Sequence, residues 1–475
     1  MMMIQEMLVR ASSLQAEAAA ESNNEKLLQA REILLALLNQ VPEEPSVLFY
    51  IATNYLLSGN NGLAIALFNR AMCFDPCNPS LHCNIASAYK LEDRCSEAEK
   101  HLIIANTLNE SSEYLNNLGA LWVNRGFPER GIPFARQALE LDSGNARAAW
   151  NLSLMELEQE NFAEGFRLYT AGIDTGDRYI KRYHINGGDS LLPIWNGERG
   201  KRIVVYGEQG LGDEIMFASA IEDLLKDCEK VVFDCHPRME GIMKRSFEPM
   251  GITVRGERKK QEIHWAEEYG LDAMVPIGNL FHQYRSDGQF PRKKYLTPNA
   301  RMVKKYRKML ESLGPPPYIG ISWAGGSKKT HARYRSLKLG NMEPLIDGRG
   351  TSVSLQYTDV AEKVERFNAG RPDDRKLHHF PDILKDFNYE KSIALAAACD
   401  VVVSVCQSIV HVCGAIGAPC IVMTPFERAW RYGKDEFMWQ YGDWVKQVHR
   451  GESEPVDQYM ARVSKAIDDH LERYR

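Results

Sequence analysis

The chain has 475 residues, of which 44% are hydrophobic and 25% charged, and its formal net charge is −5. This length exceeds what one hydrophobic core normally supports, so we expect two or three domains. No apolar run reaches the roughly 18 residues that a membrane-spanning helix needs. The first residues also lack an apolar segment followed by a cleavage-like site, so we predict a cytoplasmic protein.

The ten cysteines are scattered without a CxxC pair, which disfavours both a zinc site and a secreted disulfide framework. Cys399, Cys406, Cys413 and Cys420 recur every seven residues. The segment that holds them is predicted to cross two strands and a helix, so this period cannot describe one surface. We interpret the four cysteines as small buried residues.

Charge divides the chain unevenly. Residues 1–177 hold 12 Lys and Arg against 23 Asp and Glu, a net −11, whereas the remaining residues hold 46 against 40, a net +6. Two parts with different functions are therefore expected.

The acidic part contains an internal repeat. Ala30, Ala64 and Ala98 lie 34 residues apart, Gly131 follows after 33, and Gly165 after another 34. Small residues at a fixed period are typical of helices that touch at the same point of each unit.

The unit around Ala64 carries further residues at the spacings of a helix-turn-helix pair: Leu48, Ile51, Ala52, Tyr55, Phe68, Ala71 and Pro76. These residues resemble the tetratricopeptide repeat. We predict an α-helical repeat solenoid over residues 1–177, with about four units after an irregular N-terminal helix. Such an array either recognises a partner or extended substrate, or acts as a spacer that packs on the rest of the chain.

The second part changes period from about Lys201. Short β-rich runs such as RIVVYG, KVVFD and AMVPIG alternate with helical stretches, which predicts βα units with a parallel sheet. Three prolines at 315–317 mark a boundary, after which the alternation restarts. We predict two Rossmann-like lobes, over 178–314 and 315–475, with the site in the cleft outside the carboxyl ends of their strands.

A glycine-rich turn, GEQGLGD, follows the first of these strands. Gly207, Gly210 and Gly212 allow a tight turn and close approach to a ligand, and Asp213 begins the next helix. The spacing GxxGxG is not the dinucleotide pattern GxGxxG, although Asp234 could imitate the acid that holds a cofactor ribose. From these residues alone, Asp213 is a catalytic base, a ribose ligand or a helix cap.

The second lobe contains a comparable turn in VVVSVCQSIVHV. The backbone N–H groups of Gln407, Ser408 and Ile409 would lie at a helix start, where they suit a diphosphate. His411, one turn further, either donates to a phosphate oxygen or has a structural role.

Several motifs in order resemble one family. They are PIWNGE, GEQGLGDEIMFA, IGISWAGG, RYRSL, SVSLQ, the segment around VVVSVCQSIVHVCGAIG, and the tail WRYG…YGDW. Together they resemble bacterial glycosyltransferases with an N-terminal tetratricopeptide array, and the catalytic part is similar to the lipopolysaccharide heptosyltransferases. The resemblance implies a GT-B architecture, with the acceptor on the first lobe and a nucleotide-sugar donor on the second, and no required metal or cofactor.

The resemblance also implies roles for individual residues. Asp213 would be the general base that takes a proton from the acceptor hydroxyl, which fits a single displacement with inversion. The implied donor-side residues are Arg335, Lys328 or Lys329, Gln407, Ser408 and His411 for the phosphates, and Gln356 and Trp323 at predicted strand ends.

One place departs from the family pattern. Where the family commonly has Asp-Thr, this sequence has Cys406 and Gln407. The missing acid implies an unusual donor, a compensating group elsewhere, or loss of activity.

A basic segment leaves further functions open. Residues 255–343 hold 18 Lys and Arg against 8 Asp and Glu. This excess is either a solvated helix face or a patch for an anionic acceptor such as a lipopolysaccharide core, a phospho-glycan or DNA. The expected function is transfer of a sugar to a glycan, lipopolysaccharide or protein, with the repeat face recognising the acceptor. The alternatives are a phage-type DNA-base glycosyltransferase and a non-catalytic repeat-based binding scaffold.

Overall fold

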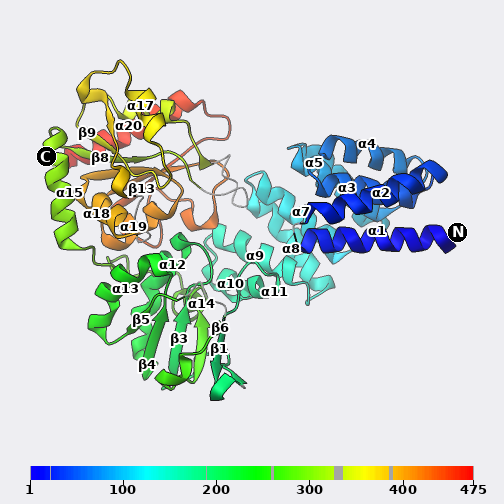
Figure 1. Cartoon of the computed structure of the whole chain (residues 1–475), viewed down its shortest axis with the longest axis horizontal. Coiled ribbons are helices and arrows are strands. Elements are labelled where there is room, and N and C mark those ends of the chain that lie inside the picture. Colours follow the sequence, from blue (N-terminus) through cyan, green and yellow to red (C-terminus); the bar gives the residue numbers. More distant parts are fainter. Residues whose placement is uncertain are drawn as a thin grey trace. The chain divides into compact units, whose positions relative to one another are not determined.

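The computed structural model describes residues 2–21, 23–188, 190–257, 262–325, 335–383 and 389–473. It divides into two compact units, Met1–Met155 and Glu156–Arg475, which appear in blue to cyan and in cyan to red in Figure 1. The two units are described in turn.

The first unit is built from antiparallel helix pairs. Its helices are α1 (Met2–Glu21), α2 (Asn24–Gln40), α3 (Pro45–Leu57), α4 (Asn61–Met72), α5 (Pro79–Leu91), α6 (Cys95–Leu108), α7 (Ser112–Asn124), α8 (Pro128–Leu141) and the first part of α9 (Ala146–Glu158). Successive helices pack as pairs, α1 with α2 through α7 with α8. The odd-numbered helices from α3 to α9 begin at residues 45, 79, 112 and 146, so the predicted repeat near 34 residues is confirmed.

Local sequence starts these helices and small residues let them touch. Asn78 precedes α5, and its side-chain oxygen accepts from the backbone N–H of Ser80 at 3.0 Å, while Pro79 occupies the first turn. Ala64 and Ala98 are fully buried where helices meet. At Gly131 an added Cβ would lie 2.6 Å from the backbone oxygen of Gly119, so that helix contact requires glycine.

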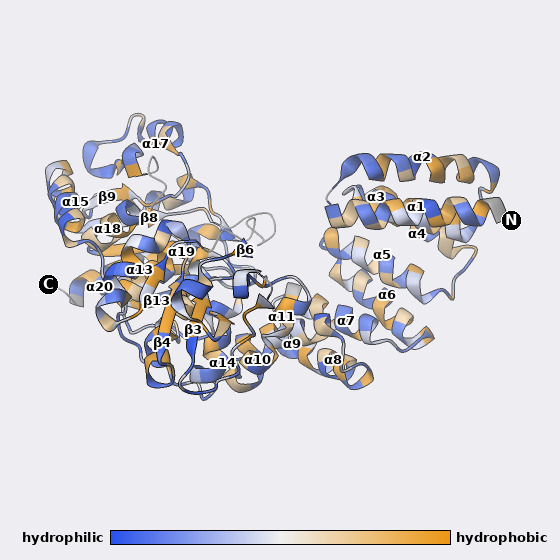
Figure 2. Ribbon diagram, turned by 60° about the horizontal axis from the view of Figure 1, so that its bottom comes forward, coloured by the Kyte–Doolittle hydropathy of each residue, from blue (hydrophilic) through white to orange (hydrophobic). Residues whose placement is uncertain are grey.

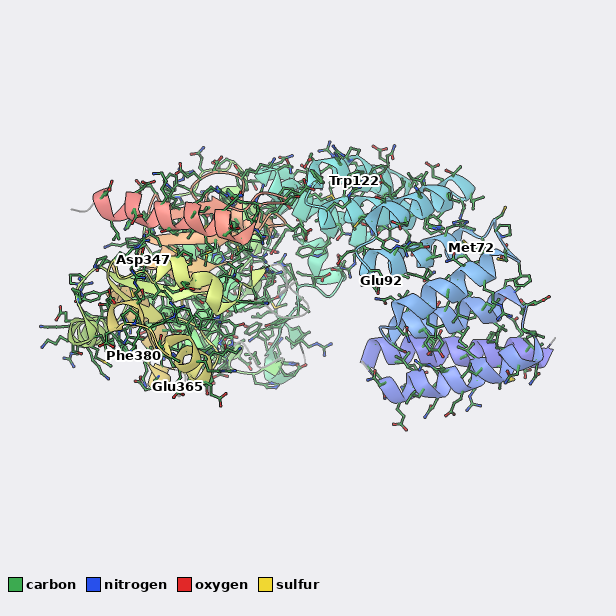
Figure 3. The ribbon with its side chains drawn as sticks, turned by 90° about the horizontal axis from the view of Figure 1, so that it is seen from above. Met72, Glu92, Trp122, Asp347, Glu365 and Phe380 are labelled. Carbon is green, nitrogen blue, oxygen red and sulfur yellow. The ribbon has the colours of Figure 1, made fainter. Side chains whose placement is uncertain are left out.

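Arginines cover the aromatic position of each repeat. The guanidinium carbon of Arg31 lies 4.5 Å from the ring centroid of Tyr55, and that of Arg94 lies 4.5 Å from the ring of Tyr89. At the next repeat Arg125 lies 4.3 Å from the ring of Trp122, which Figure 3 labels. These cation–π contacts shield large aromatic rings that the helix pairs do not enclose completely.

The second unit contains two all-parallel sheets. The first comprises β3 (Arg202–Tyr206), β4 (Lys230–Asp234), β5 (Thr253–Arg255) and β7 (Ala273–Pro276), in the order β5-β4-β3-β7. The second comprises β8 (Tyr318–Ser322), β9 (Thr351–Ser354), β10 (Leu377–His378), β11 (Val401–Val405), β12 (Cys420–Thr424) and β13 (Val445–His449), in the order β10-β9-β8-β11-β12-β13. In both sheets the strand order reverses at the first strand, which is the doubly wound pattern. The predicted parallel sheets are therefore present.

Helices cover these sheets. They are α10 (Phe162–Leu168), α11 (Ala171–Asp174), α12 (Leu211–Phe217), α13 (Glu240–Phe247), α14 (Asn279–Arg285), α15 (Ala300–Leu313), α17 (Ala361–Asn368), α18 (Glu390–Ala398), α19 (Ser408–Ile416) and α20 (Val456–Arg473). A small additional sheet of β1 (Arg182–Ile185), β2 (Ser190–Leu191) and β6 (Glu262–Ile263) was not expected from the sequence.

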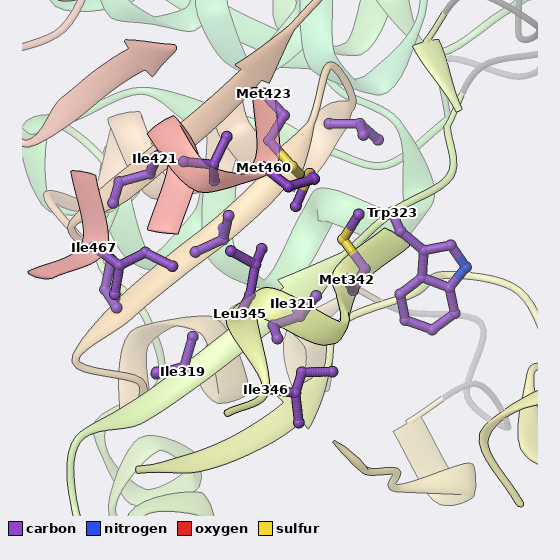
Figure 4. Packing of buried hydrophobic residues seen from close by; sticks show 14 of the residues in the cluster. Ile319, Ile321, Trp323, Met342, Leu345, Ile346, Ile421, Met423, Met460 and Ile467 are labelled. Carbon is purple, nitrogen blue, oxygen red and sulfur yellow. The ribbon is translucent and has the colours of Figure 1, made fainter. Parts of the chain in front are cut away.

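The core of the second sheet lies between its strands and α20. Figure 4 shows Ile319 and Ile321 of β8, Ile421 and Met423 of β12, and Met460 and Ile467 of α20 packed together. Figure 2 shows the middle of β3 and β4 in the hydrophobic colour, as expected for strands covered on both faces. Over the described ranges, no helix combines the length and apolar character that crossing a bilayer requires.

Two boundaries differ from those expected. The repeat part was expected to end at residue 177, but α10 and α11 belong to the second unit, where the Phe166 ring packs 5.4 Å from that of Phe281. The first lobe was expected to extend to residue 314, but α15 packs on α18, and Arg307 pairs with Asp400 at 2.7 Å. Helices α10 and α15 contact residues far along the chain, and such contacts cannot be predicted from helical periodicity.

Phe68 provides a test of the repeat core. We expect Phe68→Ala to lower the free energy of unfolding by about 3–5 kcal/mol, because this ring is fully buried between helix pairs. Phe74→Ala, in the same repeat but 44% exposed, is the matched control, and we expect it to cost less than about 1 kcal/mol. Urea unfolding followed by circular dichroism measures both, and equal losses would contradict the predicted packing.

Candidate functional site

The two sheets of the second unit meet through the helices that follow their central strands. Helix α12 follows β3, helix α19 follows β11, and the two helices pack against each other, as Figure 1 shows. At Gly212 an added Cβ would lie 2.9 Å from Cδ2 of His411 and 3.5 Å from Cα of Ser408. A side chain at this position would push the helices apart, so Gly212 permits the contact.

The three glycines of the turn do not adopt backbone angles that only glycine favours. Gly207, Gly210 and Gly212 all lie in described segments, and none of them has a positive φ. The glycines were expected to allow a tight turn. At Gly212 the structure shows instead that glycine permits two helices to approach closely.

Asp213 lies at this junction and pairs with an arginine of the other sheet. Its Oδ1 accepts a hydrogen bond from Nε of Arg431, which belongs to the short helix η10 (Trp430–Tyr432) between β12 and β13. The side chains of Asp213 and Arg431 are 15% and 22% exposed, so solvent still reaches the pair. Within the described residues, no first-turn N–H of α12 donates to Asp213, so it does not cap its helix.

A buried ion pair holds the preceding part of the same turn. Glu208 accepts two hydrogen bonds from Arg178, at 2.7 and 2.9 Å, and both side chains are fully buried. The backbone N–H of Gly278, after β7, also donates to Glu208 at 3.1 Å. This pair fills the point where the strand order of the first sheet reverses, which fixes the turn and closes that crevice. We did not single out either residue from the sequence, where the one signal was an acid directly after an apolar strand.

Asp234, considered as a ribose ligand, is already occupied by protein groups. Its carboxylate accepts from Nζ of Lys181 at 2.7 Å, the Tyr183 hydroxyl at 2.7 Å and the Glu257 N–H at 2.9 Å. The side chain is fully buried, and burial raises the pKa of this carboxyl above its usual value. Asp234 therefore joins the small sheet to β4 and presents no oxygen to a cofactor.

Gln407 caps the start of α19 with its backbone and turns its side chain inward. Its amide nitrogen donates to the Ser404 hydroxyl at 3.0 Å and to the Ser322 hydroxyl. These serines belong to β11 and β8, the strands between which the second sheet reverses order. The side chain of Gln407 thus joins two strands, and the backbone of the first turn of α19 is what remains for a ligand.

Cys406 stands at the end of β11 and is 1% exposed. Burial raises the pKa of its thiol to about 12, although the nearby Arg335 opposes this shift. The thiol is therefore neutral, and it supplies none of the charge that the family's acid would carry. Cys399, Cys413 and Cys420 are also buried, as expected.

His411 is buried in the early part of α19, and its Nδ1 lies 2.9 Å from the Tyr441 hydroxyl. Burial lowers the pKa of His411 to about 4, and the charges of Arg431 and Arg335 add to this effect while Asp213 opposes it. The imidazole is therefore neutral near pH 7 and can act only as a hydrogen-bonding group. Arg335 thus acts on His411 and on Cys406, and its role at a diphosphate stays a prediction.

The remaining candidates differ in what they contact. The Ser408 hydroxyl lies 3.3 Å from that of Tyr389. The Gln356 amide accepts from Ala324 N at 3.2 Å and donates to Ala324 O at 2.7 Å, so it holds the loop after β8. Trp323 belongs to the core beside that loop. Lys328 and Lys329 lie outside the described residues.

A small cavity lies at the carboxyl ends of β9 and β10. It measures about 10 Å³ and is lined by Ser354, Leu355, Gln356, His379, Phe380, Ile383 and Ser392. Both ring nitrogens of His379 are buried without a hydrogen-bond partner, and burial lowers the pKa of this imidazole. We did not predict a role for His379 from the sequence.

Comparisons with known proteins give a partial context. No family model matches the chain. The chain is 25% identical over 448 residues to the protein FlbA of Caulobacter vibrioides, which covers 81% of this chain and 72% of FlbA. Among solved structures, PilF of Pseudomonas aeruginosa is similar over 36% of this chain and 78% of its own, with 19% identity and a TM-score of 0.32. MamA is similar over 33% of this chain and 93% of its own, with 16% identity and a TM-score of 0.29.

His411 makes stability depend on pH. Because its pKa is about 4 when folded and about 6.5 when unfolded, its contribution is present above pH 6.5 and is lost as the pH falls toward 4. The free energy of unfolding of the unchanged chain should fall between pH 7.5 and pH 5.5, and we expect His411→Gln to make this fall smaller by about 1 kcal/mol. Thermal unfolding at both pH values measures this difference. The exposed His282→Gln is the control, and an unchanged pH dependence in His411→Gln would contradict the prediction.

Proposed function

We propose that the chain is a glycosyltransferase of the GT-B type, which moves a sugar from a nucleotide-sugar donor to a hydroxyl acceptor with inversion and without a metal. One observation carries the proposal: Asp213, on the helix after β3 of the first sheet, pairs with Arg431 of the second sheet's η10 where α12 packs on the first turns of α19. In doubly wound sheets, ligands bind where the strand order reverses, and α19 begins at that point of the second sheet.

The donor is assigned to the second sheet. The first turn of α19 presents backbone N–H groups and the positive end of a helix dipole, which suit a diphosphate. Arg335 lies close enough to lower the pKa of His411. Its guanidinium is suited to two phosphate oxygens, and the neutral His411 could add a hydrogen bond without charge.

The acceptor is assigned to the side of Asp213. In the proposed reaction Asp213 takes the proton of the acceptor hydroxyl while that oxygen forms a bond to the anomeric carbon, and the bond to the nucleoside diphosphate breaks on the opposite face. One carboxylate suffices for this single displacement. Among the described residues, Asp213 is the carboxylate whose charge acts on His411.

The repeat unit is proposed to recognise a glycan or protein acceptor. Many large apolar side chains of its helices are exposed: Val9, Leu28, Leu35, Leu57, Leu63, Phe74, Leu91, Ile103, Ile104, Leu108 and Leu141. Helical repeats present such side chains along an extended surface, which suits a long partner better than a small molecule.

Two alternatives have narrower support. DNA modification would use the basic segment, but several of its cations pair with acids, as Arg285 does with Asp223 at 2.5 Å and Lys293 with Glu222 at 2.6 Å. The exposed cations on α15 are Arg301, Lys304, Lys305 and Lys308. A non-catalytic scaffold would account for the neutral Cys406, but it gives no role to the pair of Asp213 and Arg431.

Nucleotide binding is the first test. We expect at least one of UDP, GDP, ADP, dTDP or CMP to raise the melting temperature of the full chain, because a ligand that binds only the folded state stabilises it by about 2.7 kcal/mol at one hundred times its Kd. Adenosine and uridine are the controls without phosphates. A complete absence of shifts at millimolar nucleotide would rule out the proposed donor class.

Asp213 tests the proposed chemistry. With the matching nucleotide sugar, we expect Asp213→Asn to reduce transfer or donor hydrolysis by about a hundredfold or more, the usual contribution of a general base. Nucleotide binding should persist, because Asn keeps the shape of the side chain. The exposed Asp287→Asn is the matched control. Undiminished turnover in Asp213→Asn would exclude this residue as the base.

A further inference from the structure

Arg431 holds the residue proposed as the base. It lies on η10, in the segment that joins β12 to β13, and its Nε donates to Oδ1 of Asp213 on α12. Its backbone is held as well, because the Gln440 amide donates to the Arg431 carbonyl oxygen at 2.8 Å. The ion pair therefore joins a segment of the second sheet to the acid of the first.

Arg431 occupies Oδ1 of Asp213, so an acceptor hydroxyl that approached this oxygen would have to displace the guanidinium. The other oxygen, Oδ2, lies 3.1 Å from where a Cβ would stand at Gly210, so it lies beside its own turn. Departure of Arg431 would therefore free Oδ1 for an acceptor.

The charges around the pair are not balanced. Arg335 and Arg431 both act on His411, whereas Asp213 is the carboxylate that opposes them. His411 and Cys406 are neutral for the reasons given above. The nearby Arg178 and Glu208 balance each other. Among the groups that act on His411, the arginines therefore outnumber the carboxylate, which favours an anionic ligand.

We infer that Arg431 is a donor-binding residue that exchanges its partner: it leaves Asp213 for the diphosphate of the donor, so that donor binding releases the base. The inference rests on the proposed function. A diphosphate carries more charge than one carboxylate and offers two oxygens to the planar guanidinium. The exposed part of both side chains leaves a path for the exchange without unfolding of the segment. The device would delay activation of a hydroxyl until a donor is present.

The test measures the affinity of the full chain for the nucleoside diphosphate that gives the largest thermal shift, by isothermal titration calorimetry. The informative comparison is Asp213→Asn against Asp213→Asn with Arg431→Gln. Both variants lack the charge of Asp213. A difference in affinity between them therefore cannot come from leaving that carboxylate without its arginine.

If Arg431 contacts the diphosphate, the added Arg431→Gln weakens binding by about tenfold or more, the range for a hydrogen bond to a charged group. The affinity of Arg431→Lys in the same background should lie between those of the arginine and glutamine proteins, because lysine keeps the charge but not the planar fork. Asp213→Asn alone should bind more tightly than the unchanged chain, since the diphosphate no longer competes with a carboxylate. Circular dichroism and melting temperature establish that each variant is folded.

The outcomes separate this inference from the proposed function. Equal affinities in Asp213→Asn with and without Arg431→Gln would overturn the role of Arg431 while leaving nucleotide binding intact. If the glutamine variant does not fold, Arg431→Met in the same background replaces it, and equal affinities would again overturn the role of Arg431. Absence of nucleotide binding in every protein, including the unchanged chain, would remove the proposed donor and this inference with it.

Discussion

The contact between α12 and α19 is the constraint on which the candidate site depends. It exists because Gly212 has no side chain, which lets the backbone of one helix approach the His411 ring of the other to van der Waals distance. Through this contact, Asp213, which follows a strand of the first sheet, reaches Arg431 of the second. Each sheet alone would present only half of the charged groups.

Buried charges determine what each crevice can do. In the first sheet, Arg178 and Glu208 satisfy each other at the point where strand order reverses, and Lys181 neutralises Asp234 beside β4. Such pairs contribute little net stability, because desolvation offsets their attraction, but breaking one leaves an unpaired buried charge. They therefore fix loop geometry. In the second sheet the corresponding point holds Gln407 between two serines, with no acid, and the positive charge nearby has no equal counterpart among the described residues.

Much of the fold could be predicted, because hydrophobic patterns and repeats along the chain indicate its helices and strands. The 34-residue repeat and most strands of the two parallel sheets were expected from the sequence, whereas β13 and the strands of the small sheet, β1, β2 and β6, were not. For the site, Asp213, Gly212 and His411 were expected and lie together. Gln407 was expected to offer its backbone N–H to a phosphate, which stays a prediction, and its side-chain amide bonds to Ser404. Gln356 was expected to touch donor or acceptor, but its amide bonds to Ala324. A side chain at a strand end can point either way, and the sequence does not decide which.

The sequence by itself determined the helical repeat and most strands of the two parallel sheets. It also determined that small residues recur where helices touch and that a glycine-rich turn ends in an acid. Only the tertiary structure decided which charges meet. Asp213 and Arg431 lie 218 residues apart, and Arg178 lies 30 residues from Glu208. No local pattern encodes such pairs, because they follow from how two sheets pack. The role of the acid in GEQGLGD therefore depends on an arginine that the turn itself does not contain.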